Sequence, residues 1–296
     1  MKIKKINAFS ESKKGGNPAG VVLNSPILTD YQMKLICKNL KVSETAFIFP
    51  SKIADFHIRF FSPRIEVNLC GHATIATFYA LLKENYFPVK QFFCLKQETK
   101  SGILPVEIYH KKNGIFDKIM MIQKKLKLID IKPDFSIISD ALNIDRKSID
   151  ENISKQKIST GLYTLPICVE SFDTIKKIKP NFEKIKNICK KYNVGSMHIF
   201  TFDTIDPDSI YHARNFAPLY GINEDPVTGT ANGAVCSYLL SNKIISKKEL
   251  ICEQGDILKR PGRVIVNLNN NEIRVGGKAK LVDEIEMDIK NKVINN

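Results

Sequence analysis

One sequence pattern occurs twice in this 296-residue chain, and it constrains the fold more than any other feature. Each copy has an R-x-F-[SA]-P segment, then a glycine, a stretch of small residues and a pair of leucines. Aligning Gly71 with Gly229 places Leu81–Leu82 on Leu239–Leu240 without a gap, and the second copy has about three extra residues before its glycine. Because the repeat is long and present in two copies, it predicts a duplicated protein with two lobes.

Each copy has the pattern of an extended segment, a turn at the glycine and then a helix. Apolar residues recur at helical spacing after both Gly71 and Gly229. The first amides of such a helix have no intrahelical partner and lie at the positive end of the helix dipole, so both turns are expected anion-binding sites. The other segments are mostly strand-like, which favours two α+β lobes over a Rossmann sheet.

The boundary between the lobes is expected close to a hairpin signal. Asn113–Gly114 is typical of a tight turn between two strands. We place the N-terminal lobe at residues 1–117, completed by residues 278–296. The C-terminal lobe then covers residues 118–277.

Composition indicates a soluble globular protein, with 43% hydrophobic and 26% charged residues. No stretch reaches the roughly 20 apolar residues of a membrane span, and no secretory signal is recognisable. We therefore expect a cytoplasmic location and no membrane partner. The seven cysteines are odd in number and form no C-x-x-C pair, which argues against a disulfide framework and against a zinc ribbon.

The net charge of +14 raises the question of a nucleic-acid or other anionic partner. Lysine carries most of this charge, and it is spread over many segments in which it alternates with apolar residues. This pattern is typical of solvated faces, and no RNA-binding or finger motif accompanies it. We predict no nucleic-acid partner, and nucleic-acid binding is the weakest alternative.

Several standard catalytic motifs are missing. The chain has no G-x-G-x-x-G after a strand, no P-loop, no H-E-x-x-H and no G-x-S-x-G. Neither a nucleotide cofactor nor a metal is predicted. The remaining candidates for chemistry are acid/base groups beside the two turns.

His72 and Cys70 flank the start of the first repeat helix. The helix dipole disfavours an imidazolium at this position, so a neutral His72 is expected, whereas it favours a thiolate at Cys70. The repeat partner of Cys70 is Thr228. A two-base racemase needs a thiol on each side of its substrate, and this duplication supplies one.

Two carboxylates complete the candidate set. Glu44 stands at the entry of an aromatic strand, and Asp225 precedes Pro226 in the second turn. Burial among aromatic side chains raises the pKa of a carboxyl group, which suits it to take a proton from carbon and return it. The alternatives are a solvated edge charge for Glu44 and an ordinary turn residue for Asp225.

These motifs resemble the phenazine-biosynthesis PhzF-like proteins over nearly the whole chain. The resemblance is carried by SETAF at residues 43–47, LCGHAT at 69–74, RNFAP at 214–218 and GINEDPVTGTA at 221–231. Shorter matches support it: GNPA at 16–19, EQG at 253–255, RPG at 260–262 and VGG at 275–277.

The resemblance implies a diaminopimelate-epimerase-like fold. Each of its two lobes is a curved, mostly antiparallel sheet wrapped around a central helix, and the active site lies between the lobes. Members are usually homodimers and need no cofactor. The phenazine enzyme isomerises trans-2,3-dihydro-3-hydroxyanthranilate by shifting a proton between ring carbons. The resemblance therefore implies an isomerase that acts on a small anionic substrate bearing a carboxylate.

The resemblance also implies roles for individual residues. Glu44 would be the acid/base that moves the proton, while His72 and Asp225 would position the substrate. The two turns would bind its anionic group, through Gly71, Cys70, Thr228, Gly229 and Thr230. Thr230 stands where the phenazine enzyme has serine, so a methyl group narrows the pocket. A cysteine-dependent racemase or epimerase using Cys70, and a non-catalytic binding protein that keeps the fold, are the alternatives.

Overall fold

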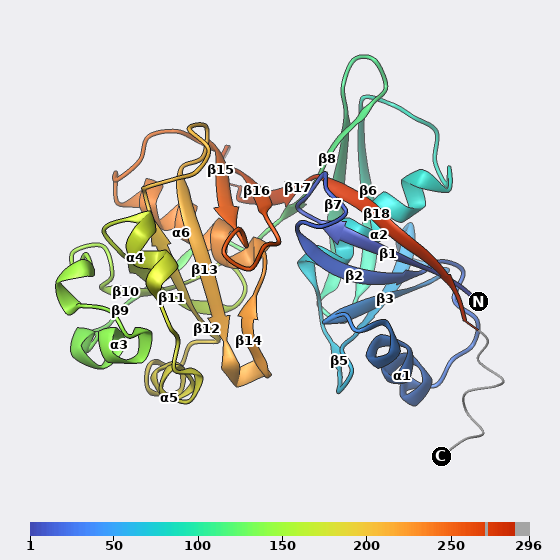
Figure 1. Ribbon diagram of the computed structural model, residues 1–296. Coiled ribbons are helices and arrows are strands. Elements are labelled where there is room, and N and C mark those ends of the chain that lie inside the picture. Colours follow the sequence, from blue (N-terminus) through green and yellow to red (C-terminus); the bar gives the residue numbers. More distant parts are fainter. Residues whose placement is uncertain (270–271, 288–296) are drawn as a thin grey trace. The chain divides into compact units, whose positions relative to one another are not determined.

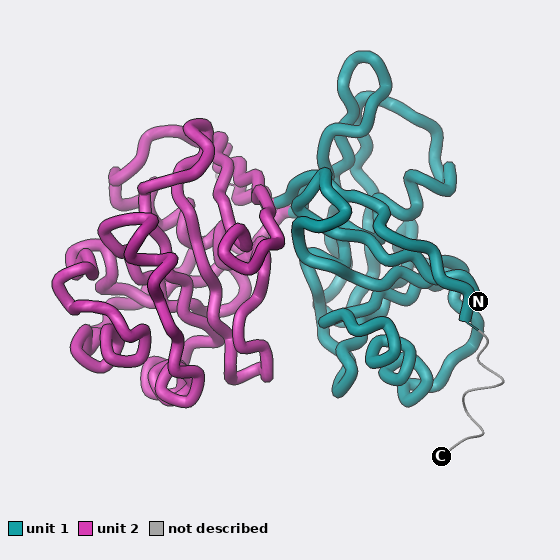
Figure 2. The backbone as a smooth tube through the Cα atoms, in the orientation of Figure 1, with its two compact units in different colours: residues 1–121, 276–296 teal, residues 122–275 magenta. Residues whose placement is uncertain are grey.

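The protein divides into two compact units in the computed structural model, which describes residues 1–269 and 272–287. Unit 1 comprises residues 1–121 and 276–296, and unit 2 comprises residues 122–275 (Figure 2). The predicted boundary after residue 117 falls inside strand β8 (Phe116–Ile122). Residues 288–296 of the predicted segment 278–296 lie outside the described residues.

Unit 1 is a sheet with a long buried helix and a second helix on its surface (Figure 1). Its helices are α1 (Asp30–Leu40) and α2 (Gly71–Lys83). Its strands are β1 (Lys2–Ala8), β2 (Asn17–Val22), β3 (Glu44–Phe49), β4 (Phe56–Phe61), β5 (Glu66–Val67), β6 (Phe92–Thr99), β7 (Gly102–His110), β8 and β18 (Ala279–Glu286). The chain passes from one unit to the other within β8 and again within β17 (Arg274–Gly277).

Unit 2 has the same kind of sheet with more helices beside it. Its helices are α3 (Phe135–Leu142), α4 (Phe172–Lys177), α5 (Phe182–Tyr192) and α6 (Gly229–Ser241), with 3₁₀ turns η1 (Arg146–Ser148) and η2 (Pro218–Tyr220). Its strands are β9 (Lys127–Asp130), β10 (Gln156–Ser159), β11 (Tyr163–Cys168), β12 (Ser196–Thr201), β13 (Tyr211–Ala217), β14 (Ile222–Asp225), β15 (Glu249–Gln254) and β16 (Gly262–Asn267).

The strands of the two units pair in the same pattern. In unit 1, β1–β2, β3–β4, β4–β5 and β6–β7 are antiparallel, whereas β2–β3 and β4–β6 are parallel. In unit 2, β10–β11, β12–β13, β13–β14 and β15–β16 are antiparallel, whereas β11–β12 and β13–β15 are parallel. A further strand pairs with the first strand of each series, β18 with β1 and β9 with β10. The shared pairing confirms the predicted duplication and the mostly antiparallel sheets.

The two repeat helices form the centres of the units. In α2 every residue from Ala73 to Leu82 is buried, and in α6 every residue from Ala231 to Leu239. Helix α2 packs against β1, β2, β3 and β18, and α6 packs against β10 and β16. Small side chains allow this close approach: a Cβ at Gly233 would lie 2.4 Å from Val275 Cγ2. This contact explains a glycine in mid-helix, where it costs about 1 kcal/mol relative to alanine.

A duplicated ion pair holds the segment before each repeat helix. Arg59 Nε and Nη2 donate to the two oxygens of Glu66 at 2.8 and 2.9 Å, and Arg214 donates to Glu224 at 2.8 Å through both nitrogens. Each guanidinium also lies about 5 Å over the ring of the phenylalanine two residues along. Glu66 and Glu224 occupy equivalent places before the two glycines, so the extra residues of the second copy fall in the η2 region.

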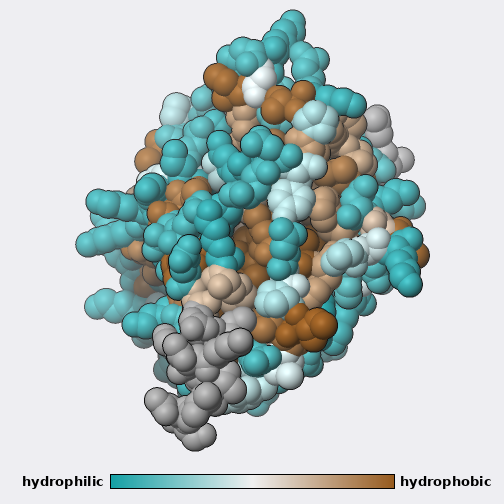
Figure 3. Space-filling model, turned by 90° about the vertical axis from the view of Figure 1, so that its right-hand side faces the viewer, coloured by the Kyte–Doolittle hydropathy of each residue, from teal (hydrophilic) through white to brown (hydrophobic). Residues whose placement is uncertain are grey.

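Charged side chains cover most of the surface. Of the lysines in the described residues, Lys4 alone is fully buried, and it pairs with Glu84 and Glu284. Figure 3 shows hydrophilic residues over most of one face, with hydrophobic residues between them. Within the described part of the chain, no helix has both the length and the apolar character needed to span a membrane.

Candidate active site

Glu44 begins β3 at the edge where the strand leaves the loop after α1. Its neighbours in the sheet are Ala19 on β2, in parallel register, and the antiparallel strand β4. The side chain is 12% exposed, and its Oε2 atom is buried without a hydrogen-bond partner. A carboxylate oxygen in this state is available to a ligand or a proton.

His72 and Cys70 bring two more reactive groups to Glu44. Cys70 is the N-cap of α2, and its side chain does not cap the helix. His72 Nε2 lies 3.3 Å from Glu44 Oε2 and 3.3 Å from Ser43 Oγ, and Cys70 Sγ lies 3.4 Å from His72 Nδ1. The structure thus joins three predicted site residues of unit 1 in one cluster.

The protonation states of the cluster follow from these contacts. Burial alone would raise the pKa of Glu44, but its interactions with His72, and smaller ones with Ser43 and Cys70, bring it below its usual value. Burial alone would lower the pKa of His72, but Cys70 and Glu44 raise it well above its usual value. Both directions favour a carboxylate on Glu44 and an imidazolium on His72.

Two expectations from the helix dipole are therefore wrong. A neutral His72 was expected, but Cys70 and Glu44 raise its pKa. A thiolate was expected at Cys70, but burial raises the pKa of this thiol. The dipole argument considered the helix backbone alone and left out the side chains of Cys70 and Glu44.

Gly71 is the first residue of α2 and does not have a positive φ. A Cβ at this position would lie 3.2 Å from Met121 Cε. The turn before the helix therefore does not require the left-handed backbone that glycine allows, and the constraint on Gly71 is space.

Unit 2 presents a different group at the equivalent place. Thr228 is the N-cap of α6, and its hydroxyl donates to Asp225 Oδ2. Gln254 Nε2 donates to Thr228 Oγ1 at 3.2 Å and to the Asp225 carbonyl at 2.8 Å. Gln254 thus donates to the Thr228 hydroxyl, and that hydroxyl donates to the Asp225 carboxylate. The Asp225 side chain is therefore an acceptor in this network.

Gly229 and Thr230, the remaining predicted binding residues, are the first residues of α6. The carbonyl of Thr230 accepts from Thr160 Oγ1 at 3.2 Å. This bond links the start of α6 to the loop after β10.

Sequence reasoning missed the polar residues that support these groups. Thr74 and Asn232 are equivalent in the repeat, and the side chain of each donates to the carbonyl of its N-cap residue, Cys70 at 2.9 Å and Thr228 at 2.8 Å. Gln254 also accepts from Thr228 N and from Asn232 Nδ2. The repeat alignment contained a signal for Thr74 and Asn232, because it places a polar residue at the same position of both helices.

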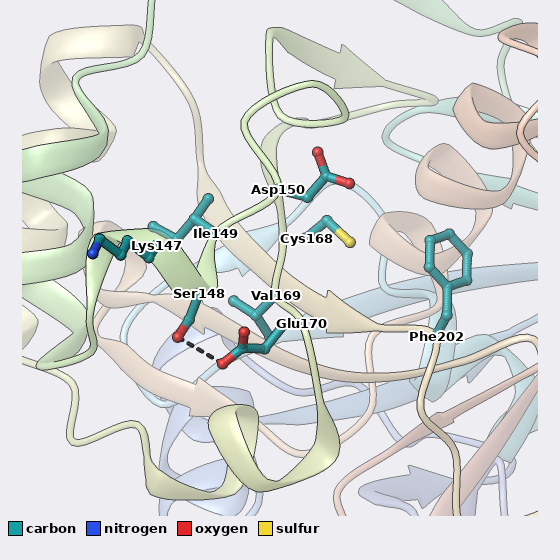
Figure 4. A pocket seen from close by; sticks show the side chains of 8 residues that line it. All are labelled: Lys147, Ser148, Ile149, Asp150, Cys168, Val169, Glu170 and Phe202. Atoms are coloured by element: carbon teal, nitrogen blue, oxygen red, sulfur yellow. Dashed lines mark hydrogen bonds between the residues drawn. The ribbon is translucent and has the colours of Figure 1, made fainter.

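A pocket of about 260 Å³ in unit 2 contains none of the predicted site residues (Figure 4). Its lining mixes charges and apolar groups, and Ser148 Oγ donates to Glu170 Oε1 at 2.8 Å. The residues that line it are Lys147, Ser148, Ile149, Asp150, Cys168, Val169, Glu170 and Phe202. The pocket is thus separate from both groups that the repeat motifs form.

Comparison with known proteins identifies the family. Residues 6–284 match the family model described as phenazine biosynthesis-like protein, PhzC-PhzF. The chain belongs to this family. It is 37% identical to a Clostridium acetobutylicum protein named an uncharacterized isomerase, over 95% of this chain and 96% of the relative. Names of this kind support an isomerase or epimerase-like activity in the family.

Solved structures agree on the fold. A PhzF-family phenazine biosynthesis protein of Bacillus anthracis matches with a TM-score of 0.88 at 32% identity, covering 97% of this chain and 98% of that one. A probable proline racemase of Agrobacterium radiobacter matches with a TM-score of 0.63 at 11% identity, covering 97% and 92%. The second likeness is one of fold alone. The predicted family and epimerase-like fold are confirmed.

Proposed function

We propose that this protein is a cofactor-independent isomerase that shifts a proton between carbons of a small substrate bearing a carboxylate. The observation that carries the proposal is the buried Glu44 Oε2, which has no hydrogen-bond partner and lies 3.3 Å from His72 Nε2. Membership of the PhzF family and the isomerase names of its relatives support the reaction class.

In the proposed reaction Glu44 acts first as a base and then as an acid. Its carboxylate takes a proton from one substrate carbon and becomes a carboxylic acid, and the bonding electrons move into the substrate. Glu44 then returns the proton to a second carbon, which restores the carboxylate. No electron is gained or lost overall, so the step needs no redox partner.

His72 stabilises this cycle in two ways. As an imidazolium it keeps Glu44 ionised before the reaction. It also carries an N–H that can donate to negative charge developing on the substrate, and a fixed donor of this kind stabilises a transition state. The same pairing makes Glu44 a weaker base, which makes it harder for Glu44 to take a proton from carbon.

The role of unit 2 in substrate binding stays part of the proposal. Asp225, held by Thr228, would accept hydrogen bonds from substrate N–H or O–H groups. The first amides of α2 and α6 would bind the substrate carboxylate. A homodimer and a cytoplasmic location complete the proposal, and light scattering after size exclusion tests the dimer.

A cysteine-dependent racemase or epimerase is the second candidate. The contact between Cys70 Sγ and His72 favours it, because an imidazole can accept the thiol proton. Two observations oppose it: burial raises the pKa of Cys70, and the equivalent residue in unit 2 is Thr228. A binding protein without activity is the third candidate, and it predicts no exchange with any substrate.

Deuterium incorporation in heavy water tests the proposal. Dihydrohydroxyanthranilate and a panel of small amino and hydroxy acids are incubated with wild type and with Glu44→Gln, and mass spectrometry detects exchange at carbon. We expect at least one compound to exchange or isomerise only with wild type. Equal exchange in both proteins, or exchange lost only in Cys70→Ser, would overturn the Glu44 mechanism.

A further inference from the structure

The cluster of unit 1 has the donor set of a metal site. Glu44, Cys70 and His72 each offer one ligand atom, and these three atoms lie within 4.8 Å of one another. We propose that these residues bind a thiophilic divalent cation, Zn²⁺ or Cd²⁺. The structure supplies the three donors from two elements, the first residue of β3 and the start of α2.

The three donors lie close enough together for one ion to recruit them. His72 Nε2 lies 3.3 Å from Glu44 Oε2 and 3.8 Å from Cys70 Sγ. With zinc–ligand bonds of 2.0–2.3 Å, neighbouring ligand atoms of a tetrahedral zinc site are about 3.3–3.6 Å apart. Cys70 Sγ lies nearer to His72 Nδ1, at 3.4 Å, than to Nε2, so the imidazole must turn before Nε2 and the sulfur can share an ion.

Glu44 Oε2 is the atom that most favours a ligand here, because it is buried and makes no hydrogen bond. The His72 imidazolium lies 3.3 Å from this oxygen without making a hydrogen bond to it, and a coordinate bond to a metal cation would satisfy the oxygen better. The main neighbour of the oxygen, His72 Nε2, is itself a metal ligand after it loses its proton. Ion binding would thus replace a contact that lacks hydrogen-bond geometry with two coordinate bonds.

The chemistry of the donors selects the ion. One sulfur, one nitrogen and one carboxylate oxygen suit zinc and its heavier analogue, whereas Mg²⁺ and Ca²⁺ prefer shells of oxygen. Three protein ligands leave a fourth position for water or for a carboxylate. In unit 2 the place of Cys70 is taken by Thr228, whose hydroxyl already donates to Asp225, so the equivalent site lacks the sulfur.

Inhibition is the expected consequence, and this consequence rests on the proposed function. The ion would occupy Glu44 Oε2 and His72 Nε2, the two atoms assigned to proton transfer. Two protons would leave to the buffer, the thiol proton of Cys70 as the metal–sulfur bond forms and the Nε2 proton of His72 as the metal–nitrogen bond forms. Metal binding itself does not depend on which reaction the protein catalyses.

A cadmium titration of the chelator-treated full-length protein tests the site. Formation of a cadmium–thiolate bond is followed by its ultraviolet charge-transfer absorption, and zinc affinity is then measured by competition with a chelating dye. Wild type should bind one equivalent. Since loss of an outer-shell partner alone costs about 10–100-fold in metal affinity, loss of the Cys70 sulfur should weaken binding by at least about 100-fold.

Cys94→Ser is the matched control, because its thiol is exposed and lies outside the cluster. This variant should bind as wild type does. Cys70→Ser should lose the absorption band and remain folded, since serine is a favoured N-cap residue. Glu44→Gln should keep the band with weaker affinity. A band that persists in Cys70→Ser, for example from Cys236 and Cys252, whose sulfurs lie 3.3 Å apart, would overturn the proposal.

An activity measurement separates this inference from the proposed function. With a substrate that exchanges in heavy water, zinc at the affinity measured by titration should abolish exchange in wild type, and a chelator should restore it. In Cys70→Ser, exchange measured relative to the metal-free rate of that variant should respond much less to the same zinc concentration. Binding through Cys70 that leaves wild-type exchange unchanged would support the metal site and contradict the role of Glu44.

Discussion

The two units share the supporting contacts at the start of their central helices and differ in the reactive groups that lie there. In both, an arginine–glutamate pair fixes the segment before a buried helix, and a polar residue in that helix donates to the carbonyl of the N-cap residue. Unit 1 then presents a carboxylate, an imidazolium and a thiol. Unit 2 presents a carboxylate held by a hydroxyl and an amide. The proposed function accordingly assigns proton transfer to unit 1 and substrate positioning to unit 2.

Replacing the carboxylate of each unit should give the largest contrast. Glu44→Gln is isosteric and removes the group that transfers the proton, so kcat should fall by about 10²–10⁴-fold. Asp225→Asn should act mainly on KM, because it changes a hydrogen-bond acceptor. Steady-state kinetics on an exchanging substrate measures both, and an unchanged kcat in Glu44→Gln would end the assignment of roles.

Replacing Gln254 in unit 2 should destabilise the protein more than replacing Gln97 in unit 1. Gln254 makes hydrogen bonds with Asp225, Thr228 and Asn232, so Gln254→Leu leaves several buried partners unsatisfied and should cost about 3 kcal/mol of unfolding free energy. In unit 1, Gln97 accepts from Thr74 Oγ1 at 3.4 Å, where Thr74 is the repeat partner of Asn232, and Gln97→Leu should cost about 1 kcal/mol. Urea denaturation measures the unfolding free energy of both variants. Equal decreases would show that the two glutamines stabilise their units equally.

The pH profile should expose the ion pair of unit 1. The lowered pKa of Glu44 gives stability that is present above its unfolded pKa and lost as the pH falls through the folded pKa. The raised pKa of His72 gives stability that is present below its unfolded pKa and lost as the pH rises through the folded pKa. In His72→Asn burial dominates the pKa of Glu44, so the acid limb of kcat/KM should move to higher pH.

Ser43→Ala serves as the control for this shift, because Ser43 touches the same imidazole and contributes less to the pKa of Glu44. Its acid limb should move by less than that of His72→Asn. An acid limb that stays fixed in His72→Asn would mean that Glu44 does not set it.

The smallest effect on catalysis should come from replacing Cys70, whose equivalent in unit 2 is Thr228. Cys70→Ser replaces the thiol by a hydroxyl, as in the Thr228 of unit 2, and should leave kcat within a few-fold of wild type. Alkylation of Cys70 should still block exchange by its bulk. Loss of exchange in Cys70→Ser would favour the racemase.

The sequence predicted the features that a local pattern encodes. The repeat located both central helices, and the family motifs pointed to Glu44 and His72 together. The raised pKa of His72 could not be predicted from the helix dipole, because it depends on side-chain contacts with Cys70 and Glu44 that form only in the fold. Gln254 was missed for the same reason, since β15 follows α6 and returns to its N-terminus. The glutamates of the two ion pairs could have been found, because Glu66 and Glu224 align in the repeat.

The pairing of β1 with β18 has a consequence for synthesis on the ribosome. Strand β1 leaves the exit tunnel first, but its partner β18 is the last strand of the described chain. The nascent protein therefore carries an open strand edge on unit 1 while all of unit 2 is being translated, and such edges can pair with other chains. Unit 2, which is contiguous, can finish folding earlier. The N-terminal half of this protein is made first and completed last.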